Sequence, residues 1–583
     1  MRKHITRDTR YAMRQSVSCL ATALLGIMTI AATARAAETK APTDEQKAFL
    51  QSILPADVPA PKPTEAQAER GFIHYWADPT VNFFTNMPPV VEDLDRQPIV
   101  RTPAGEDEPL LLGVWGLRRM HHAALWVLEP VFETTVWVVS DPGEREIMGM
   151  AKLGIPYFLE PDGEPKIESE HNVFFWINVN VPADAKPGTY TGKFALTVSE
   201  QPWSEGHKKH NYGHRIELPF MVEVLPIKLP RADVAFGMYF RPLGQWMAPQ
   251  YCTPELMRAY YRDMARHGQT SATMYVYERL VDDQGNLFLD GKRTTRRMEM
   301  MREAGLIHPD IPFMWLGSGG LEWETEERAR EHSVTMRAEF ERRSWPEPLW
   351  YGPDEPSTPE EDAERSAGAR SNFDRMAALR PTLRIVTAIS SQAAAHFADD
   401  LDVWVVHNPN IDVAVKELAE KHGAEFWTYD CRHRGTNPTW NRYYPGLFTW
   451  AYGLKGNFLW CYSELYTWES TRGAALVWVL PSRFGPIPSV GWETRREGIE
   501  DYRYLSELEK LCRIADEAKA EQVKQWLAEL RNRVLAPGKF EKPLLPYWWD
   551  RFDLWTQCPQ FARGELTQIR NQAIRFMLEL QAP

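Results

Sequence analysis

The chain has 583 residues, of which 44% are hydrophobic and 25% charged, so it is long enough for two or three domains with large cores. Its formal net charge is −12; without the first 36 residues, 61 basic and 78 acidic side chains remain, a net charge of −17. A chain this acidic repels nucleic acid and anionic lipid, which excludes both as general partners.

Residues 1–36 have the pattern of a secretory signal peptide. Basic residues come first, an apolar run follows over 17–30, and Ala34-Arg35-Ala36 supplies the small residues of a cleavage site. The apolar run is short for a membrane span, and no other stretch of the sequence is long enough. We therefore expect export to the periplasm or to the outside of the cell, without integral membrane association. Nothing in the sequence indicates an oligomeric state.

Residues 37–94 begin rich in Pro, Ala and Glu and predict a linker or N-terminal arm. From 95 to 230, short apolar or alternating runs are separated by turn signals, and no long amphipathic helix interrupts them. This pattern predicts an antiparallel β-sandwich. Its clearest strands are expected over residues 135–139, 174–181, 190–198 and 216–224.

Between residues 231 and 490, strand-like runs alternate with helical ones. Eight strands are expected, over residues 235–240, 272–276, 311–316, 349–352, 384–389, 402–407, 425–429 and 457–462. Eight alternating units in roughly 230 residues predict a central (β/α)8 TIM barrel, with a doubly wound sheet as the alternative.

Helix signals support this alternation. A helix is expected over 254–267, with Thr253 as its N-cap and Pro254 at its first position. Another is expected to begin at Thr358, with Glu361 completing a capping box. Residues 491–583 predict a C-terminal helical appendix, with helices over 493–518, 521–534 and 566–580. In its first helix we expect Arg496 and Glu500 to pair on a solvated surface.

Asp354 and Glu355 follow the fourth predicted strand, inside the proline-framed run Leu349-Trp350-Tyr351-Gly352-Pro353-Asp354-Glu355-Pro356. A carboxylate pair is a common basis for acid chemistry on a sugar, since a protonated carboxyl donates to the leaving oxygen and an ionised one stabilises positive charge. TIM-barrel sites form at the carboxyl ends of the strands, where this pair is expected to lie. We therefore interpret the pair as catalytic rather than as a surface turn.

The other strand ends are expected to supply the walls of the substrate pocket. They carry Tyr239, Arg241, Tyr275, Tyr277, His407, Asn408, Tyr429, Asp430, Tyr462 and Glu464. Trp427 and Trp460 lie within predicted strands and are expected in the core. Most of the 23 tryptophans should be core residues, and a few should be flat platforms for sugar rings.

Asp430 opens a second possibility for the chemistry. The two carboxylates of a retaining glycosidase often lie on different strands about 5 Å apart, so Glu355 as acid with Asp430 as nucleophile is an alternative pairing. Four basic residues follow Asp430, namely Arg432, His433, Arg434 and Arg442. We favour internal ion pairing for them over recognition of a sulfated or uronate sugar.

Five cysteines follow residue 36, at positions 252, 431, 461, 512 and 558. Their wide spacing lacks the paired pattern of a zinc site, so neither a metal nor another cofactor is expected. A large core does not need disulfides, and most of these thiols are expected to be small buried residues.

Three segments together resemble glycoside hydrolase family 123 and its relatives: residues 350–356, the aromatic stretch 426–462 and residues 496–505. The resemblance covers roughly residues 95–510 and implies a β-N-acetylgalactosaminidase without a cofactor. It also implies a substrate-assisted route, in which the 2-acetamido oxygen of the substrate attacks the anomeric carbon. By matching position, Asp354 would orient the acetamido group, and Glu355 would protonate the leaving oxygen and then activate water.

Two other hypotheses remain open from the sequence. The chain is either a carbohydrate-binding protein on a barrel without catalysis, or a glycosidase for anionic or non-acetamido sugars that uses Glu355 with Asp430. The intact carboxylate pair argues against the first, because a pure binder has no need of two adjacent acids. In all three hypotheses the partner is a glycan.

Overall fold

The computed structural model describes residues 60–582 apart from 141–143, 148–150, 155–156, 162, 164, 202–212, 243–246, 248, 317–324, 408–410, 432–437, 464–477 and 537–560. The expected signal peptide over 1–36 lies outside the described residues. Within the described part of the chain, no helix combines the length and the apolar character that a membrane span requires.

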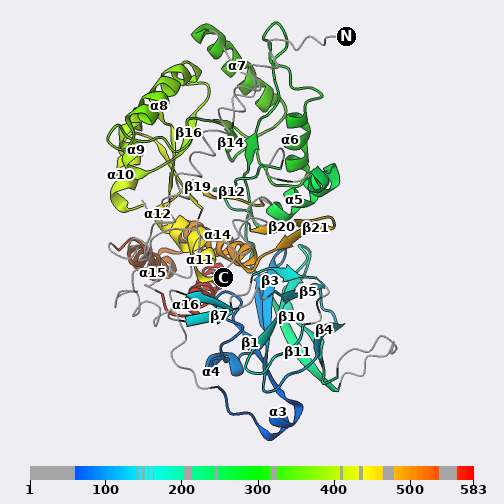
Figure 1. Ribbon diagram of the computed structural model, residues 1–583. Coiled ribbons are helices and arrows are strands. Elements are labelled where there is room, and N and C mark those ends of the chain that lie inside the picture. Colours follow the sequence, from blue (N-terminus) through cyan, green and yellow to red (C-terminus); the bar gives the residue numbers. More distant parts are fainter. Residues whose placement is uncertain are drawn as a thin grey trace, which may run out of the picture. The chain divides into compact units, whose positions relative to one another are not determined.

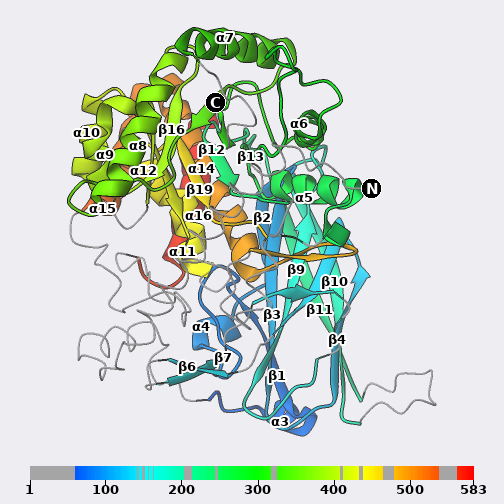
Figure 2. The same ribbon diagram turned by 45° about the horizontal axis from the view of Figure 1, so that its top comes forward.

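The expected β-sandwich is present in two main sheets. The first has the order β1 (Phe72–Ala77), β3 (Asp107–Gly116), β9 (Asn172–Asn180), β5 (Glu133–Val139), β8 (Leu159–Glu160). The second has the order β2 (Ile99–Pro103), β11 (His214–Leu225), β10 (Gly188–Ser199), β4 (His122–Glu129). The pairing is antiparallel except between β2 and β11. The long strands β3 and β9 pair in the first sheet, and β10 and β11 pair in the second (Figure 2). A separate pair joins β6 (Glu144–Ile147) to β7 (Ala151–Gly154).

The sandwich begins earlier in the chain than the sequence pattern predicted. Strand β1 pairs with β3 and is buried on both faces, with Phe72 and Trp76 in the core between the sheets and Ile73 on the outer face. Helix α3 (Glu65–Arg70), capped by Thr64, leads into it, and the short helix α4 (Val91–Leu94) follows it. The linker or arm predicted over 37–94 is therefore wrong for residues 65–94, which contain α3, β1 and α4. The sequence pattern did not show this, because the partner strand of β1 lies far along the chain.

The central domain is a nearly closed parallel barrel, which confirms the predicted TIM-barrel architecture over the doubly wound alternative. Its sheet order is β12-β19-β18-β17-β16-β15-β14-β13, so each strand lies beside its neighbours around the ring. The strands are β12 (Ala235–Met238), β13 (Thr273–Tyr275), β14 (Phe313–Leu316), β15 (Pro348–Tyr351), β16 (Ile385–Ile389), β17 (Val403–His407), β18 (Glu425–Asp430) and β19 (Gly456–Leu459).

Strand β17 illustrates why these runs read as continuously hydrophobic. Val403 and Val405 belong to the cluster that fills the barrel, whereas Trp404 and Val406 belong to the cluster between the strands and the helices. Both faces of a parallel strand are buried in this architecture, so polar residues are confined to its ends. The functional side chains therefore stand out at the strand ends.

Helices connect the barrel strands and lie outside them (Figure 1). They are α5 (Pro254–Arg266), α6 (Arg293–Glu303), α7 (Glu326–Arg342), α8 (Ala363–Met376), α9 (Ser391–His396), α10 (Val413–Lys421), α11 (Pro438–Tyr443), the π-helix η6 (Tyr444–Phe448) and α12 (Thr449–Tyr452). Short 3₁₀ turns are η2 (Pro249–Tyr251), η3 (Ala377–Leu379) and η4 (Ala398–Asp400). The hairpin β20 (Val479–Ser482) and β21 (Gly485–Pro488) precedes the C-terminal helices.

One of the two helix starts was predicted correctly. Thr253 caps α5, since its side chain accepts a hydrogen bond from the backbone N–H of Leu256. Helix α8 instead begins at Ala363, with Asp362 as its cap. The contact expected of a capping box exists, because the N–H of Thr358 donates to Glu361 (3.0 Å), but it closes a turn in front of the helix.

The C-terminal helices are α14 (Val490–Ile514), α15 (Glu517–Leu535) and α16 (Glu565–Gln581). The expectation of a solvated pair on α14 is wrong. Arg496 and Glu500 do approach each other (3.7 Å), but their side chains are only 3% and 2% exposed. Arg496 also contacts Glu493 at 2.6 Å and Glu497 at 3.3 Å. The helical spacing of these charged residues predicted an exposed helix face. In the structure they form a buried ionic cluster.

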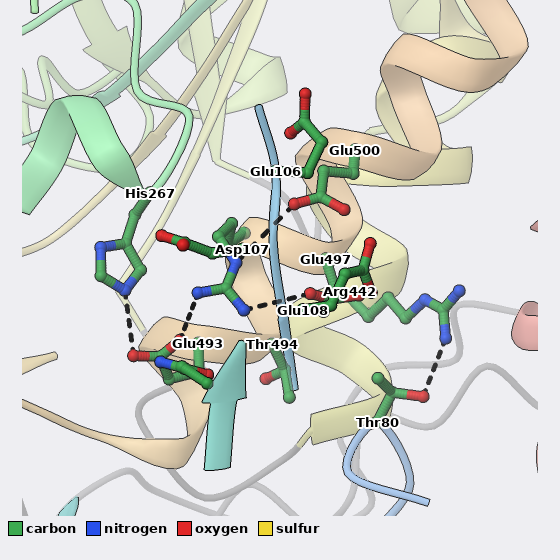
Figure 3. A network of polar contacts seen from close by, with 12 residues as sticks. Thr80, Glu106, Asp107, Glu108, His267, Arg442, Glu493, Thr494, Glu497 and Glu500 are labelled. Atoms are coloured by element: carbon green, nitrogen blue, oxygen red, sulfur yellow. Dashed lines mark hydrogen bonds and ion pairs between the residues drawn. The ribbon is translucent and has the colours of Figure 1, made fainter. Parts of the chain in front are cut away.

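This cluster joins the three parts of the described chain. Figure 3 shows Glu108 of the sandwich and His267 of the barrel beside Glu493, Glu497 and Glu500 of α14. His267, at the end of α5 in the barrel, lies 3.2 Å from Glu493. Arg570 of α16 contacts Glu497 at 2.7 Å and Asp501 at 2.5 Å. Glu108, on β3 of the sandwich, gathers with Glu497 and Glu500 in one buried carboxylate group. Helix α14 is therefore the common support of sandwich, barrel and tail.

We predict that Glu108 makes stability depend on pH. Burial, and then the charge of Glu497, raise the pKa of Glu108 to about 8, although Arg570 opposes them. Since the folded protein holds this proton more tightly than the unfolded chain, the stabilisation is full below about pH 4.5. It is lost as the pH rises toward about 8, by at most about 1.4 kcal/mol per pH unit.

Glu108→Gln, which mimics the protonated carboxyl, should therefore gain stability relative to the wild type between pH 5 and pH 8. Urea unfolding of both chains at the two pH values measures this difference. His267 and Glu493 contribute equally in both chains, whereas Glu500, whose pKa the charge of Glu108 raises, is part of the measured difference. An equal difference at both pH values would show that Glu108 does not hold the proton.

Candidate active site

Asp354 and Glu355 follow strand β15 at the carboxyl rim of the barrel, and both are exposed. Leu349 and Tyr351 of this strand point into the barrel, while Trp350 points toward the helices. The hydroxyl of Tyr351 donates to Asp354 Oδ1 at 2.7 Å and accepts from the N–H of Ala388 at 3.1 Å. The strand alternation thus supplies a buried donor that holds the first carboxylate in position.

Glu355 is held differently. Its backbone φ is +45°, a left-handed conformation that is rare for a residue with a side chain, and its N–H donates to the carbonyl of Ala388 at 3.1 Å. The hydroxyl of Tyr429, from β18, donates to Glu355 Oε1. Uncommon conformations of this kind concentrate at functional sites. The fold therefore holds this turn in one conformation and directs the glutamate toward the barrel mouth.

Both tyrosine donors remain protonated at neutral pH. Burial is the main cause that raises the pKa of Tyr351, with the charges of Tyr239 and Asp354 adding to it. Burial likewise raises the pKa of Tyr429, followed by the charge of Glu355. Each carboxylate therefore has its own permanent O–H donor, from β15 for Asp354 and from β18 for Glu355.

Aromatic rings and one arginine form the adjoining wall. The guanidinium carbon of Arg241 lies 4.5 Å from the ring centre of Tyr275 and 5.0 Å from that of Trp460. Tyr277 stacks on Tyr275 with ring centres 6.2 Å apart, and the residue is 57% exposed. Tyr239 lies deeper and contacts both Trp460 and Tyr429. Flat aromatic faces beside carboxylates suit the apolar faces of a sugar ring.

Arg241 carries the positive charge of this wall. Burial acts to lower the pKa of Arg241, but Tyr275, Tyr277 and Asp354 outweigh it, so the pKa lies above its ordinary value. The guanidinium therefore stays charged and offsets part of the negative charge of Asp354.

The structure brings most of the predicted pocket residues together. Side-chain contacts link Tyr239, Arg241, Tyr275, Tyr429 and the carboxylates, with Tyr277 and His407 stacked at the edges. Tyr462 does not join them, because strand β19 ends at Leu459 and the Tyr462 hydroxyl donates to Asp263 of α5 at 2.7 Å. Asn408 and Glu464 lie outside the described residues.

Two tryptophan expectations had opposite outcomes. Trp427 is fully buried and belongs to the barrel core, as predicted. Trp460 is partly exposed and faces Arg241, so its assignment to the core is wrong. Together with Tyr351 it was missed as a site residue. Position along the strand could have identified Tyr351 as a site residue, since it is the last residue of β15 that points into the barrel.

Asp430 has a structural environment that disfavours the alternative pairing. Its side chain is fully buried, and its charge acts on the buried Arg495, whose pKa burial lowers to about 9. A nucleophile must reach the substrate, and a carboxylate enclosed in this way does not. Arg442, one of the four basic residues, is buried and paired with Asp501 at 2.6 Å, as internal ion pairing predicts. Arg432, His433 and Arg434 lie outside the described residues.

One group at the rim has the chemistry of metal ligands. The ligand atoms of His407, Asp430 and Cys431 all lie within 4.8 Å of one another. The His407 ring stacks on Tyr429, with ring centres 4.9 Å apart. The group therefore lies directly behind the donor to Glu355.

Comparison with solved structures finds the same overall fold in a glycoside hydrolase. A family 123 glycoside hydrolase from Clostridium perfringens superposes with a TM-score of 0.59, over 88% of this chain and 100% of that one, at 13% identity. A family 39 glycoside hydrolase from Bacteroides cellulosilyticus WH2 reaches only 0.32, over 69% and 82%, at 10% identity. No protein-family model and no curated protein sequence matches the chain. The first comparison establishes a shared fold and, at this identity, nothing further.

Proposed function

We propose that this protein is an exported glycosidase that removes terminal β-linked N-acetylgalactosamine from glycans. The observation that carries the proposal is the exposed Asp354–Glu355 pair at the barrel rim, each acid held by a buried tyrosine hydroxyl. The shared fold supports it, because the Clostridium perfringens enzyme is described as acting in glycolipid glycan hydrolysis. The signal-like residues 1–36 are the basis for export.

Adjacent acids suit a reaction in which the substrate supplies its own nucleophile. The acetamido oxygen forms a bond to the anomeric carbon while the glycosidic bond breaks, and Glu355 gives its proton to the departing oxygen. Asp354 accepts from the acetamido N–H and stabilises the positive oxazolinium ring. Water then attacks the anomeric carbon, reopening the ring, and Glu355 takes the proton of that water.

Each tyrosine orients one of the two acids. Tyr351 donates to Asp354 Oδ1 and holds that carboxylate in position. Tyr429 occupies one oxygen of Glu355, which leaves the other for the glycosidic oxygen. Arg241, Tyr277 and Trp460 supply the sugar-facing wall.

Hydrolysis by the purified chain tests the proposal. An aryl β-N-acetylgalactosaminide should be cleaved, whereas the matching β-galactoside, which lacks the acetamido group, should be cleaved at least tenfold more slowly. Equal cleavage of both would favour a conventional nucleophile. Glycan binding without cleavage of either would favour the carbohydrate-binding hypothesis.

We also predict that each tyrosine contributes to catalysis through its hydroxyl alone. Tyr429→Phe and Tyr351→Phe should each lower kcat about 10- to 100-fold, since a hydrogen bond to a charged group contributes about 1.5–3 kcal/mol. The matched control is Tyr462→Phe, whose hydroxyl bonds to Asp263 away from the site and should leave kcat within a few-fold of the wild type. An equal loss in all three variants would indicate a general effect on folding.

A further inference from the structure

We infer that His407, Asp430 and Cys431 form a binding site for a zinc-type divalent cation behind the candidate acid. The three side chains come from the ends of the adjacent strands β17 and β18, which pair in parallel. They supply one nitrogen, one oxygen and one sulfur, the donor set that zinc accepts.

The spacing matches a tetrahedral centre. With Zn–S near 2.3 Å and Zn–N near 2.0–2.1 Å, two ligands at the tetrahedral angle lie about 3.6 Å apart. Cys431 Sγ and His407 Nε2 are 3.7 Å apart. The carboxylate of Asp430 completes the group within 4.8 Å. An ion bound here requires little movement of the nitrogen and sulfur ligands.

Charge and burial also suit a cation. Asp430 is fully buried, while His407 and Cys431 are partly exposed, so the group has one dry side and one side open to solvent. A cation converts the Cys431 thiol to a thiolate and releases its proton to solvent. The Cys431 thiolate and the Asp430 carboxylate then balance the two positive charges of the ion. The charge of Asp430 also raises the pKa of the buried Arg495.

The site lies next to Tyr429, so a bound ion would affect the tyrosine that donates to Glu355. The His407 ring stacks on Tyr429, and Tyr429 donates to Glu355. An ion that fixes the imidazole therefore also limits the movement of this tyrosine. The site goes beyond the proposed activity, because binding is measured without any sugar substrate.

Cobalt(II) is the probe for the test, since it takes zinc sites and gives a near-ultraviolet charge-transfer band when a thiolate binds it. The purified chain, freed of metal with a chelator and kept in a phosphine reductant, should bind one equivalent with this band, and zinc should displace it. Cys431→Ser should lose the band, and His407→Gln should weaken binding at least tenfold.

Cys252→Ser is the matched control, because Cys252 is also partly exposed but lies beside Pro242, outside the group. It should retain the band and the affinity. Absence of the band in the wild type, or its persistence in Cys431→Ser, would overturn the inference. Circular dichroism checks the fold of each variant, and His407→Gln decides the outcome if Cys431→Ser does not fold.

Discussion

Replacing Glu355 with glutamine is expected to lower kcat for an aryl β-N-acetylgalactosaminide about 10²- to 10⁴-fold, the usual contribution of a general acid–base residue. The substitution preserves shape and leaves an acceptor for the Tyr429 hydroxyl. Only the transferable proton is lost. Secondary structure and thermal stability should therefore stay close to those of the wild type.

The leaving group separates the two acids. In Glu355→Gln the loss should shrink for a dinitrophenyl glycoside, because such a good leaving group departs without a proton. In Asp354→Asn the loss should be similar for good and poor leaving groups, because Asp354 acts on the acetamido side of the ring. Near wild-type turnover in both variants would refute the assignment of the pair.

Replacing Arg570 with methionine is expected to lower the free energy of unfolding by about 3–5 kcal/mol, the usual effect of breaking a buried ion pair. The Arg570 side chain is 7% exposed and contacts Glu497, Glu500 and Asp501. Methionine fills part of the volume of the arginine side chain, but it removes one of the cations that face these three acids. Denaturant unfolding measures the loss.

Two further variants identify the cause of the stability loss in Arg570→Met. Arg101→Met breaks an ion pair with Glu223 (2.7 Å) whose side chains are 40% and 38% exposed, and should cost no more than about 1 kcal/mol. Adding Glu497→Gln to Arg570→Met should restore part of the lost stability, because one unpaired charge is removed. If Arg101→Met costs as much as Arg570→Met, the buried cluster has no special role.

The sequence predicted the barrel because its signals are local. Each strand is a short apolar run between helical segments, and burial on both faces makes those runs distinct, as Val403–His407 shows. The pair Asp354–Glu355 was predictable for the same reason, since its position after a strand places it at the rim. The strand β1 was not, because its pairing depends on β3 more than 30 residues later.

The burial of charged residues and the direction of side chains beyond the strand ends were harder to predict from the sequence. Arg496, Glu497 and Glu500 resemble a solvated helix face, and only long-range partners such as Arg570 and Glu108 allow them to be buried. Tyr462 was assigned to the pocket because the strand was expected to run three residues further than it does. The direction of a residue beyond a strand end depends on the loop geometry, which the alternation pattern does not contain.

Substitution on the acetamido group of the substrate tests the central claim most directly. If the acetamido oxygen is the nucleophile, replacing N-acetyl with N-trifluoroacetyl in the same aryl β-galactosaminide should lower kcat/KM by well over tenfold, because fluorine withdraws electrons from that oxygen. A thiazoline mimic of the oxazolinium should inhibit the cleavage of the parent substrate. Equal rates for the two substrates, together with no inhibition by the thiazoline, would contradict the account.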